Sequence, residues 1–296
     1  MLNPWLELPS FRESIEAQAA ISGVDLIVHG TTSDADTIRN TAIAQPLIVA
    51  SSVASFAALL AEAGVDSAEQ LNNAGFAGHS VGEVAAAVLS GVMTPEQGIS
   101  FVTKRGSAMA EAAAMESTSM AAVIGGEQDA VEAKLAEYDL SPANYNGGGQ
   151  IVAAGRLADI ERLVADAPAG MRVVPIQVAG AFHTKFMQPA VAQLSEFADT
   201  LTVADPHSPL WTNAGGRIVG SGSEYLSLLV QQVSSPVRWD LCMSAMIEAG
   251  VTAVIELAPA GTLTGLAKRS MPGVELLAVK TPENLEAALS LINNHA

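Results

Sequence analysis

The stretch AGFAGHSVGEVAAAVLSGV, residues 74–92, decides the fold of this chain. A short apolar piece leads through glycines into an alanine-rich segment that ends at Gly91. This order predicts a strand, a sharp turn and a helix. Residues 78–82 also match the pattern G-x-S-x-G, in which a serine lies on a strand-to-helix turn with its Oγ exposed. We therefore expect an α/β protein with Ser80 as a candidate nucleophile.

Two interpretations of this turn remain open. In the first, Ser80 attacks a carbonyl group, and the Val81 N–H at the start of the next helix donates a hydrogen bond to the oxyanion that develops. In the second, the segment is a glycine-rich helix start that contains an incidental serine. The strand-turn-helix context favours the nucleophile, because that context is what the motif requires.

A serine at its ordinary pKa is a weak nucleophile and needs a base. The chain contains the following histidines: His29, His79, His183, His207 and His295. We expect the His79 side chain to point away from Ser80, its neighbour in the chain. His183 lies where the chain returns from a small domain to a large one, and clefts form at such junctions. His183 is our candidate base, with a purely structural histidine as the alternative.

The chain after residue 117 predicts a small domain inserted into a larger one. Strand-like and helical segments alternate in the order β-α-β-α-β over roughly 60 residues, which suits a ferredoxin-like or split βαβ domain. We expect a small ferredoxin-like α+β domain at residues 118–181. Residues 1–117 and 182–296 then form a hydrolase-like large α/β domain with a parallel sheet, and the active site lies between the two domains.

Local patterns place the elements of the large domain. The expected helices are 41–64, 82–91, 94–115, 189–200, 225–233, 239–250 and 284–294. The expected strands are 74–77, 210–213 and 252–257.

The composition excludes several classes of protein. Of the 296 residues 49% are hydrophobic and 15% are charged, and the net charge is −17. Such an acidic chain is a poor match for nucleic acid or for an anionic membrane surface. Cys242 has no second cysteine to pair with, and no Cys/His spacing resembles a zinc site. Apolar runs are broken before the roughly 18 residues that a spanning helix needs. The sequence predicts a cytoplasmic protein without a metal or a redox cofactor.

Several segments together carry a resemblance to a known family. They are GHSVGEVAAAVLSGV (78–92), Lys104-Arg105-Gly106, NYNGGGQIVAAG (144–155), GAFHT (180–184), Pro236-Val237-Arg238-Trp239 and GTLTGLAKR (261–269). In combination they resemble the malonyl-CoA:acyl carrier protein transacylases of actinobacterial fatty acid synthesis. The resemblance extends from near Trp5 to beyond Lys280, which is nearly the whole chain.

The resemblance implies an acyltransferase that moves a malonyl group from coenzyme A to the phosphopantetheine thiol of acyl carrier protein. Ser80 carries the malonyl group between the two, and His183 removes the Ser80 proton and later returns one to the departing thiol. In this family a main-chain carbonyl orients the imidazole, and Gln232 aligns best with that position. No cofactor takes part, and malonyl-CoA is a substrate.

The resemblance also implies a site for the malonyl group. Arg105 grips the carboxylate with its planar fork, although an arginine on a helix is ordinarily a solvated surface residue. Phe182 fills the space where the extra methyl group of methylmalonyl would sit. Gln45 matches a family glutamine near the pocket, and a residue that caps or braces the helix start is an equal alternative. Glu83 is expected to favour the dipole of its helix and to stay outside the mechanism.

One feature of the family has no match in this sequence. Family members begin with an apolar strand and a Gly-Gln-Gly-x-Gln loop whose first glutamine supplies a second oxyanion N–H, and this sequence starts after that place. Three alternative explanations fit the missing strand and loop: a misplaced start, a shortened chain or an evolved loss. With the Val81 N–H as the remaining oxyanion donor, the expected cost is about 10²–10³ in rate.

The expected partners are malonyl-CoA and acyl carrier protein, and we expect a monomer that binds neither nucleic acid nor membrane. Because such carriers are acidic, docking requires a local basic patch. The candidate residues are Lys104, Arg105, Lys185, Arg238, Lys268 and Arg269. Two other functions fit the same residues. One is an acyl-thioester hydrolase, and the other is a carrier-binding relative that has lost turnover with its N-terminal loop.

Overall fold

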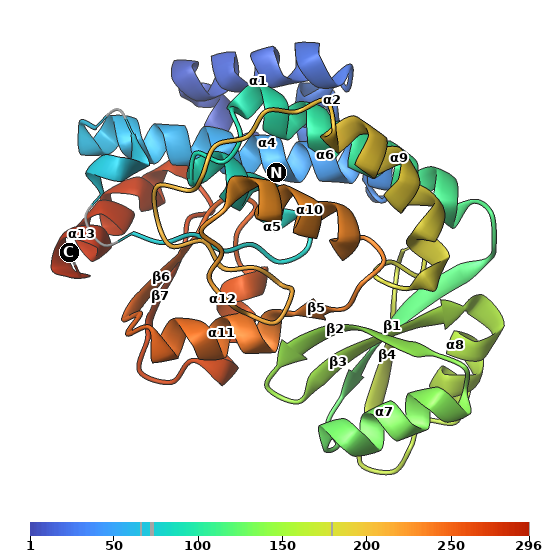
Figure 1. The fold of residues 1–296 in the computed structure, drawn as a ribbon. Helices are drawn as coiled ribbons and strands as arrows, with labels where there is room; N and C mark the ends of the chain where they lie inside the picture. Colours follow the sequence, from blue (N-terminus) through green and yellow to red (C-terminus); the bar gives the residue numbers. More distant parts are fainter. Residues whose placement is uncertain (66, 72–73, 179, 296) are drawn as a thin grey trace.

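The structure, a computed structural model, describes residues 1–65, 67–71, 74–178 and 180–295. It is an α/β protein with two separate groups of strands under a layer of helices (Figure 1). The α-helices are α1 Pro9–Ser22, α2 Leu26–Thr31, α3 Ala35–Ile38, α4 Thr41–Ala63, α5 Gly82–Leu89, α6 Pro95–Ala113, α7 Gln128–Glu137, α8 Leu157–Ala165, α9 Gln188–Ala198, α10 Gly222–Gln232, α11 Trp239–Glu248, α12 Thr262–Ser270 and α13 Leu285–His295. The strands are β1 Thr118–Ile124, β2 Ser141–Gly147, β3 Gln150–Arg156, β4 Arg172–Ile176, β5 Val237–Arg238, β6 Ala253–Glu256 and β7 Glu275–Ala278. Short 3-10 helices are η1 Trp5–Glu7, η2 Ala68–Gln70, η3 Lys185–Met187 and η4 Pro282–Asn284.

The chain from β1 to β4 forms the smaller of two units, with the elements in the order β1-α7-β2-β3-α8-β4. Its strands lie in the order β4-β1-β3-β2, and each neighbouring pair is antiparallel. Alternate side chains of β1 separate the two faces: Ala121 and Val123 pack against the apolar side chains of α7 and α8, whereas Met120 joins a second cluster on the other face. This arrangement confirms the ferredoxin-like insert, and the boundaries at 117/118 and 181/182 stay predictions.

Strand β2 is a correction to the sequence analysis, which predicts three strands in this unit and leaves out residues 141–147. Pro142, Asn144 and Asn146 are residue types that are depleted in strands. Contacts with other segments hold β2 in place, since it pairs with β3 on one side and in parallel with β5 on the other. The sheet of the smaller unit therefore continues into a strand of the larger one.

The larger unit has the parallel pairing that the sequence predicts. Strands β6 and β7 are parallel, and Phe76 forms an isolated parallel bridge with Leu210. The strands predicted at 74–77 and 210–213 are reduced to isolated bridges, so they are shorter than expected. The sequence does not predict helices α1, α2, α3 and α12 or strands β5 and β7. Helices α1 and α12 have no capping side chain at their start, whereas α2 and α3 do but are only six and four residues long.

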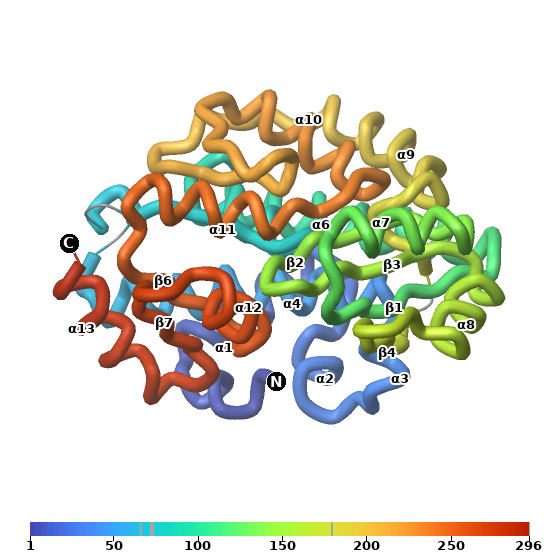
Figure 2. The backbone as a smooth tube through the Cα atoms, turned by 90° about the horizontal axis from the view of Figure 1, so that it is seen from below, coloured from blue at the N-terminus to red at the C-terminus, as the bar shows by residue number. Residues whose placement is uncertain are grey.

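Helix α4 is the helix predicted at residues 41–64. The Ala42 N–H donates to the Asn40 side chain at 3.0 Å, and Gly64 ends the helix with φ 67°. By length and composition α4 is apolar enough to cross a membrane, which corrects the expectation that no apolar run is long enough. However, 61% of its most apolar window is buried, and it packs against α1, α5, α6 and α13 (Figure 2). In this structure α4 is a core helix.

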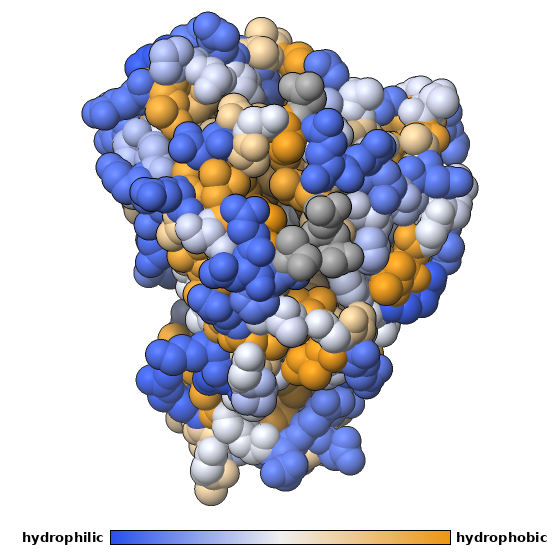
Figure 3. Space-filling model, turned by 90° about the vertical axis from the view of Figure 1, so that its left-hand side faces the viewer, coloured by the Kyte–Doolittle hydropathy of each residue, from blue (hydrophilic) through white to orange (hydrophobic). Residues whose placement is uncertain are grey.

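Apolar side chains at the surface are scattered. On the face that Figure 3 shows, they lie in separate patches among charged and polar side chains. The exposed large hydrophobic residues of the described chain are far apart in sequence: Met1, Ile21, Val28, Met115, Leu157, Val174, Ile218 and Ile247. Single exposed apolar residues are normal for a globular protein.

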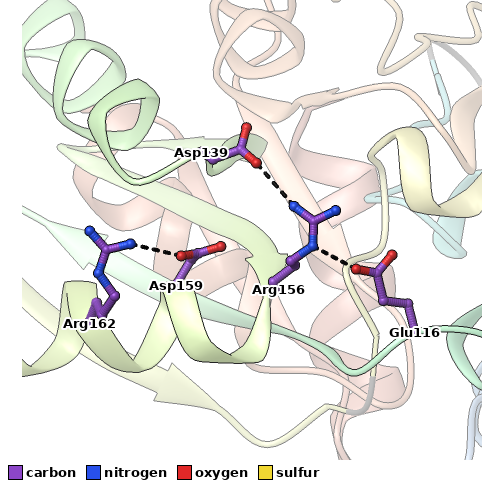
Figure 4. A network of polar contacts seen from close by, with 5 residues as sticks. All are labelled: Glu116, Asp139, Arg156, Asp159 and Arg162. Atoms are coloured by element: carbon purple, nitrogen blue, oxygen red, sulfur yellow. Dashed lines mark hydrogen bonds and ion pairs between the residues drawn. The ribbon is translucent and has the colours of Figure 1, made fainter.

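Arg156, at the end of β3, ties the smaller unit to the segment that enters it from α6 (Figure 4). Its Nε donates to Glu116 Oε1 at 2.6 Å and its Nη1 donates to Asp139 Oδ2 at 3.1 Å. Its guanidinium also lies over the Phe186 ring, 5.7 Å from the centroid. The three ionic side chains are 46–69% exposed. Exposed pairs of this kind contribute at most about 1 kcal/mol each to stability.

Candidate active site

Ser80 and His183 are 103 positions apart in sequence and hydrogen-bonded in the structure. Ser80 Oγ lies 2.7 Å from His183 Nε2, and His183 Nδ1 lies 2.8 Å from the main-chain oxygen of Gln232. Because a carbonyl oxygen only accepts hydrogen bonds, Nδ1 carries the proton and Nε2 keeps a lone pair toward Ser80. The imidazole is oriented by a carbonyl, as the resemblance implies for Gln232.

Both members of this pair have a strained backbone. Among the described non-glycine residues only Ser80, Asp139 and His183 have a positive φ, at 52°, 56° and 62°. Such conformations cost on the order of 1–3 kcal/mol each and are typical of functional sites. The turn at Ser80 also requires glycine, because a Cβ on Gly78 would lie 2.0 Å from the carbonyl carbon of Gly82.

His183 is buried, with 4% of its surface exposed. Burial, together with the positive charge of Arg105, lowers the pKa of His183 to about 3, although the hydrogen bond to Gln232 opposes the shift. The imidazole is therefore neutral at pH 7, which is the form that accepts a proton.

Arg105 extends from α6 into the same site and is 1% exposed. Its Nη1 donates to Gln45 Oε1 at 2.5 Å, and its Nη2 donates to Gln232 Oε1 at 2.8 Å and to Ser80 Oγ at 3.3 Å. Its Nε is buried and has no hydrogen-bond partner among the described residues. Burial lowers the pKa of Arg105 to about 10, so the guanidinium keeps its charge at pH 7. The solvated surface arginine of the alternative interpretation is wrong.

Known proteins are similar to this chain in sequence and in fold. The family model described as the acyl transferase domain matches residues 6–281. The malonyl CoA-acyl carrier protein transacylase of Mycobacterium tuberculosis is 43% identical over 291 residues, which are 98% of this chain and 95% of that protein. The chain belongs to the acyl transferase domain family.

Solved structures match equally well. The crystal structure of MCAT from Mycobacterium tuberculosis has a TM-score of 0.90 and 44% identity, and the match covers 97% of this chain and 93% of that one. A complex of the transacylase PlMCAT with the type II polyketide carrier AntF also matches, with a TM-score of 0.90, 28% identity and coverage of 98% and 94%.

Gln45 lies in the site of this acyl transferase and does not cap a helix. It is 6% exposed on α4, and its Nε2 donates to Met109 Sδ at 3.3 Å while its Oε1 accepts from Arg105. The cap of α4 is Asn40 instead. Gln45 therefore does not cap α4, but its bonds to Arg105 and Met109 brace the start of α4 against α6. A role of Gln45 in binding stays a prediction.

Phe182 and Val81 are the chain neighbours of the two reacting groups, His183 and Ser80. Val81 precedes α5, and its N–H donates no hydrogen bond within the described chain, so it is free to reach an oxyanion. The ring of Phe182 is partly buried against the cluster Met120, Ala143, Val152, Ala154 and Ala181. The selectivity of Phe182 against methylmalonyl stays a prediction.

Glu83 lies in the first turn of α5, where the sequence predicts it, and it also has contacts that the sequence does not predict. The side chain is 1% exposed and accepts from the Asn213 N–H at 2.7 Å and from Gln232 Nε2. Burial raises the pKa of Glu83 to about 7, against the hydrogen bonds of Asn213 and Thr212, the charge of Arg105 and the hydrogen bond of Gln232. Glu83 thus belongs to the polar network beneath the site.

Asn213 is also outside the sequence prediction. It is the last residue of segment 210–213, which predicts only a strand, and no motif marks it. Its side chain bonds to the backbone of Ser80 and Gly78, which are 133 and 135 positions away in the sequence.

His79, the neighbour of Ser80, points elsewhere as expected. Its Nε2 lies 2.9 Å from Asn146 Oδ1 of β2, and its ring packs edge-on against Trp239. This contact links the turn at Ser80 to the smaller unit. Burial lowers the pKa of His79, although the hydrogen bond to Asn146 opposes the shift.

The predicted basic patch is partly wrong. Arg105 is buried, and Arg238 forms an ion pair with Asp240 at 2.7 Å and lies over the Tyr145 ring. Lys104 Nζ donates to Gln193 at 3.0 Å. Three candidates are exposed: Lys268 and Arg269 in the last turn of α12, and Lys185. A basic patch formed by these residues stays a prediction.

Among the described residues no group of three or more His, Cys, Asp or Glu side chains is arranged to hold a metal ion.

Proposed function

We propose that this chain moves a malonyl group from coenzyme A to the phosphopantetheine thiol of acyl carrier protein, in fatty acid biosynthesis, through a malonyl-serine at Ser80. The observation that carries the proposal is the position of Arg105. A buried guanidinium whose Nη2 is 3.3 Å from the hydroxyl of Ser80 suits an acyl group that ends in a carboxylate. The malonyl transacylase names of the relatives support the same reaction.

In the first half-reaction His183 Nε2 takes the proton of the Ser80 hydroxyl as Oγ attacks the thioester carbonyl. Their distance of 2.7 Å supports this proton transfer. The Val81 N–H donates to the oxyanion of the tetrahedral intermediate. The carbon–sulfur bond then breaks, and the sulfur of coenzyme A leaves with the proton that His183 returns.

In the second half-reaction the thiol of the carrier replaces coenzyme A. His183 takes the thiol proton, the sulfur attacks the malonyl ester, and the Ser80 oxygen leaves and regains the proton. Each half-reaction returns His183 to its neutral form. A complex of a related transacylase with its acyl carrier protein supports a carrier as the partner.

Arg105 selects the acyl group in this proposal. Its guanidinium is held on two sides by Gln45 and Gln232, so its direction is set before substrate arrives. A malonyl carboxylate forms charge-assisted hydrogen bonds with it, whereas an acetyl group leaves the buried charge unpaired. This difference favours malonyl over acetyl.

The proposal needs no metal ion and no redox cofactor, because the serine and histidine complete each proton transfer. It includes a cytoplasmic location, where coenzyme A thioesters are made and used, and a monomeric chain.

The experiment is intact-protein mass spectrometry after brief incubation with malonyl-CoA, with acetyl-CoA in parallel and Ser80→Ala as the control. We expect a malonyl adduct on the wild type, little acetyl adduct, and none on Ser80→Ala. Addition of carrier bearing phosphopantetheine removes the adduct and loads the carrier. A folded wild type without an adduct contradicts the proposal, and an adduct lost to water at the same rate with or without carrier indicates a hydrolase.

A further inference from the structure

The side-chain amide of Asn213 is bonded to the backbone on both sides of residue 79. The Ser80 N–H donates to Asn213 Oδ1 at 2.8 Å, and Asn213 Nδ2 donates to the Gly78 carbonyl at 2.8 Å. The amide therefore occupies the donor and the acceptor that a neighbouring strand would otherwise use. Asn213 is 1% exposed, so these bonds do not compete with water.

The backbone of Asn213 is fixed as firmly as its side chain. Its N–H donates to Glu83 Oε1 at 2.7 Å, and its carbonyl accepts from the Arg238 and Gly215 N–H groups at 3.1 and 3.0 Å. Gln232 Nε2 also reaches Asn213 Oδ1, at 3.3 Å. Every polar group of Asn213 is thus bonded, to α5, to α10 and to the segment before α11.

The segment that Asn213 holds is strained. Ser80 has φ 52°, a conformation that a serine leaves readily unless its surroundings oppose the change. Rotation out of this conformation would move both the Ser80 Oγ, which bonds to His183, and the neighbouring Val81 N–H. The bonds to Asn213 act on the Ser80 amide itself, so they oppose that rotation directly.

We propose that Asn213 is a positioning residue for acyl transfer: its amide locks residues 78–80 in the conformation that aims Ser80 Oγ at His183 and the Val81 N–H at the oxyanion. The proposal rests on the proposed function of Ser80. It assigns Asn213 no contact with substrate, and the gripping residue Arg105 has no bond to it. Loss of the amide therefore lowers the rate of Ser80 acylation and leaves the affinity for malonyl-CoA almost unchanged.

The first experiment measures single-turnover acylation of Asn213→Ala by malonyl-CoA with intact-protein mass spectrometry. We expect the rate constant to fall by about 10²-fold, the effect typical of a small misplacement of a reacting group. The half-saturating concentration of malonyl-CoA stays within about threefold, and every folded chain still becomes acylated. Cys242→Ala is the matched control. Its Sγ accepts a hydrogen bond from Asn213 Nδ2 at 3.6 Å, so Cys242→Ala removes that bond and leaves the two bonds to Gly78 and Ser80 in place.

The second experiment uses Asn213→Asp, which keeps the size of the side chain. A protonated carboxyl accepts from the Ser80 N–H and donates to the Gly78 carbonyl, whereas a carboxylate has no proton to donate and repels that carbonyl. The titratable groups around the position are Glu83 on α5, Arg105 on α6, Tyr225 on α10 and Cys242 on α11. Buried beside Glu83, the new carboxyl is expected to stay protonated at mildly acid pH.

The readout is the acylation rate of Asn213→Asp divided by that of the wild type, from pH 5 to pH 8. We expect a ratio near one at the acid end and a fall of at least about tenfold toward pH 8, while the ratio for Cys242→Ala stays flat. If Asn213→Ala does not fold, this ratio decides the question. A ratio that does not change with pH, or an Asn213→Ala that acylates at the wild-type rate, overturns the proposal. A wild type that acquires no malonyl group contradicts the proposed function instead.

Discussion

Two arginines of this protein lie in hydrogen-bonded networks whose partners differ in charge. Arg156 is about half exposed and is paired with the carboxylates of Glu116 and Asp139 (Figure 4). Arg105 is buried, and the side chains that accept from it are the neutral Gln45 and Gln232 and the hydroxyl of Ser80. Within the described chain Arg105 forms no ion pair.

The difference between charged and neutral partners indicates the role of each arginine. A carboxylate partner cancels the charge of Arg156, which then serves only to hold two segments together. Amide partners orient Arg105 without cancelling its charge, and the nearest acid of the network, Glu83, reaches it through Gln232. Glu83 attracts the charge of Arg105 at longer range, but no carboxylate contacts the guanidinium. Because a buried charge without a contacting counter-ion is costly, the position of Arg105 beside Ser80 supports the anionic acyl group of the proposed function.

The largest effect is expected for Arg105→Ala. Loss of a buried partner of a charge typically costs about 2–5 kcal/mol, so kcat/KM for malonyl-CoA should fall by roughly 30- to 5,000-fold. Acylation by acetyl-CoA should change far less, because the acetyl group has no carboxylate. The measurement is kcat/KM for both thioesters. An equal loss for both would show that Arg105 does not select the acyl group.

The next effect concerns the acid in the Arg105 network. Burial raises the pKa of Glu83 from 4.5 to about 7. A carboxyl whose folded pKa is raised destabilises the fold as the pH rises from its unfolded pKa through its folded one, here by roughly 3 kcal/mol. His183 and His79 have lowered pKa values and therefore add stability over the same pH range in both proteins, so the test is the difference between the two. From pH 5 to pH 8 the free energy of unfolding of the wild type, measured with urea, should fall by roughly 3 kcal/mol relative to that of Glu83→Gln. Identical pH dependence in the two proteins would contradict the assigned shift.

The charge of Arg105 should also be visible at His183. Because His183 has a pKa lowered to about 3 by burial and by Arg105, the wild-type rate of Ser80 acylation should not fall at the usual histidine value of 6.5. In Arg105→Gln the acid limb should move to higher pH, since the repelling charge is gone. Arg156→Gln is the control and should leave the limb in place. The measurement is the acylation rate against pH, and a limb unmoved by Arg105→Gln would refute the electrostatic coupling.

A smaller effect is expected at the exposed cations Lys268 and Arg269. Charge reversal of each to Glu should raise the KM for acyl carrier protein by up to about tenfold, and more at low salt, because rim charges mainly steer association. Acylation by malonyl-CoA is measured in the same proteins to separate carrier docking from chemistry. Arg172→Glu, an exposed cation on β4, controls for net charge. Unchanged transfer to the carrier would remove the basic patch from the proposal.

The smallest effect is expected for Arg156→Ala. Its two exposed pairs should each contribute at most about 1 kcal/mol to the free energy of unfolding, and malonyl acylation should equal that of the wild type. Denaturant unfolding and the acylation rate test both statements. A large loss of activity would mean that the two arginine networks are not separate in function.

The helices that the sequence predicts correctly are marked by capping residues and glycines that lie within a few residues of the helix ends. Helix α6 begins at the expected capping box of Thr94 and Gln97, and α4 ends at Gly64. The sequence does not predict strand β2, because Pro142, Asn144 and Asn146 disfavour a strand and outnumber Tyr145, which favours one. Strand β2 forms because β3 and β5 offer backbone partners on both sides.

The sequence by itself determined the turn at residues 78–82, the alternation of the ferredoxin-like insert and, through resemblance, the site residues Ser80, His183, Arg105, Gln45 and Gln232. Caps, glycines and apolar periodicity act over a turn or a strand, so they can be recognised in the chain alone. Only the tertiary structure decided that Glu83 and Asn213 join this site. Their burial and hydrogen bonds arise between segments 130 and more positions apart, where no local pattern records which residues meet.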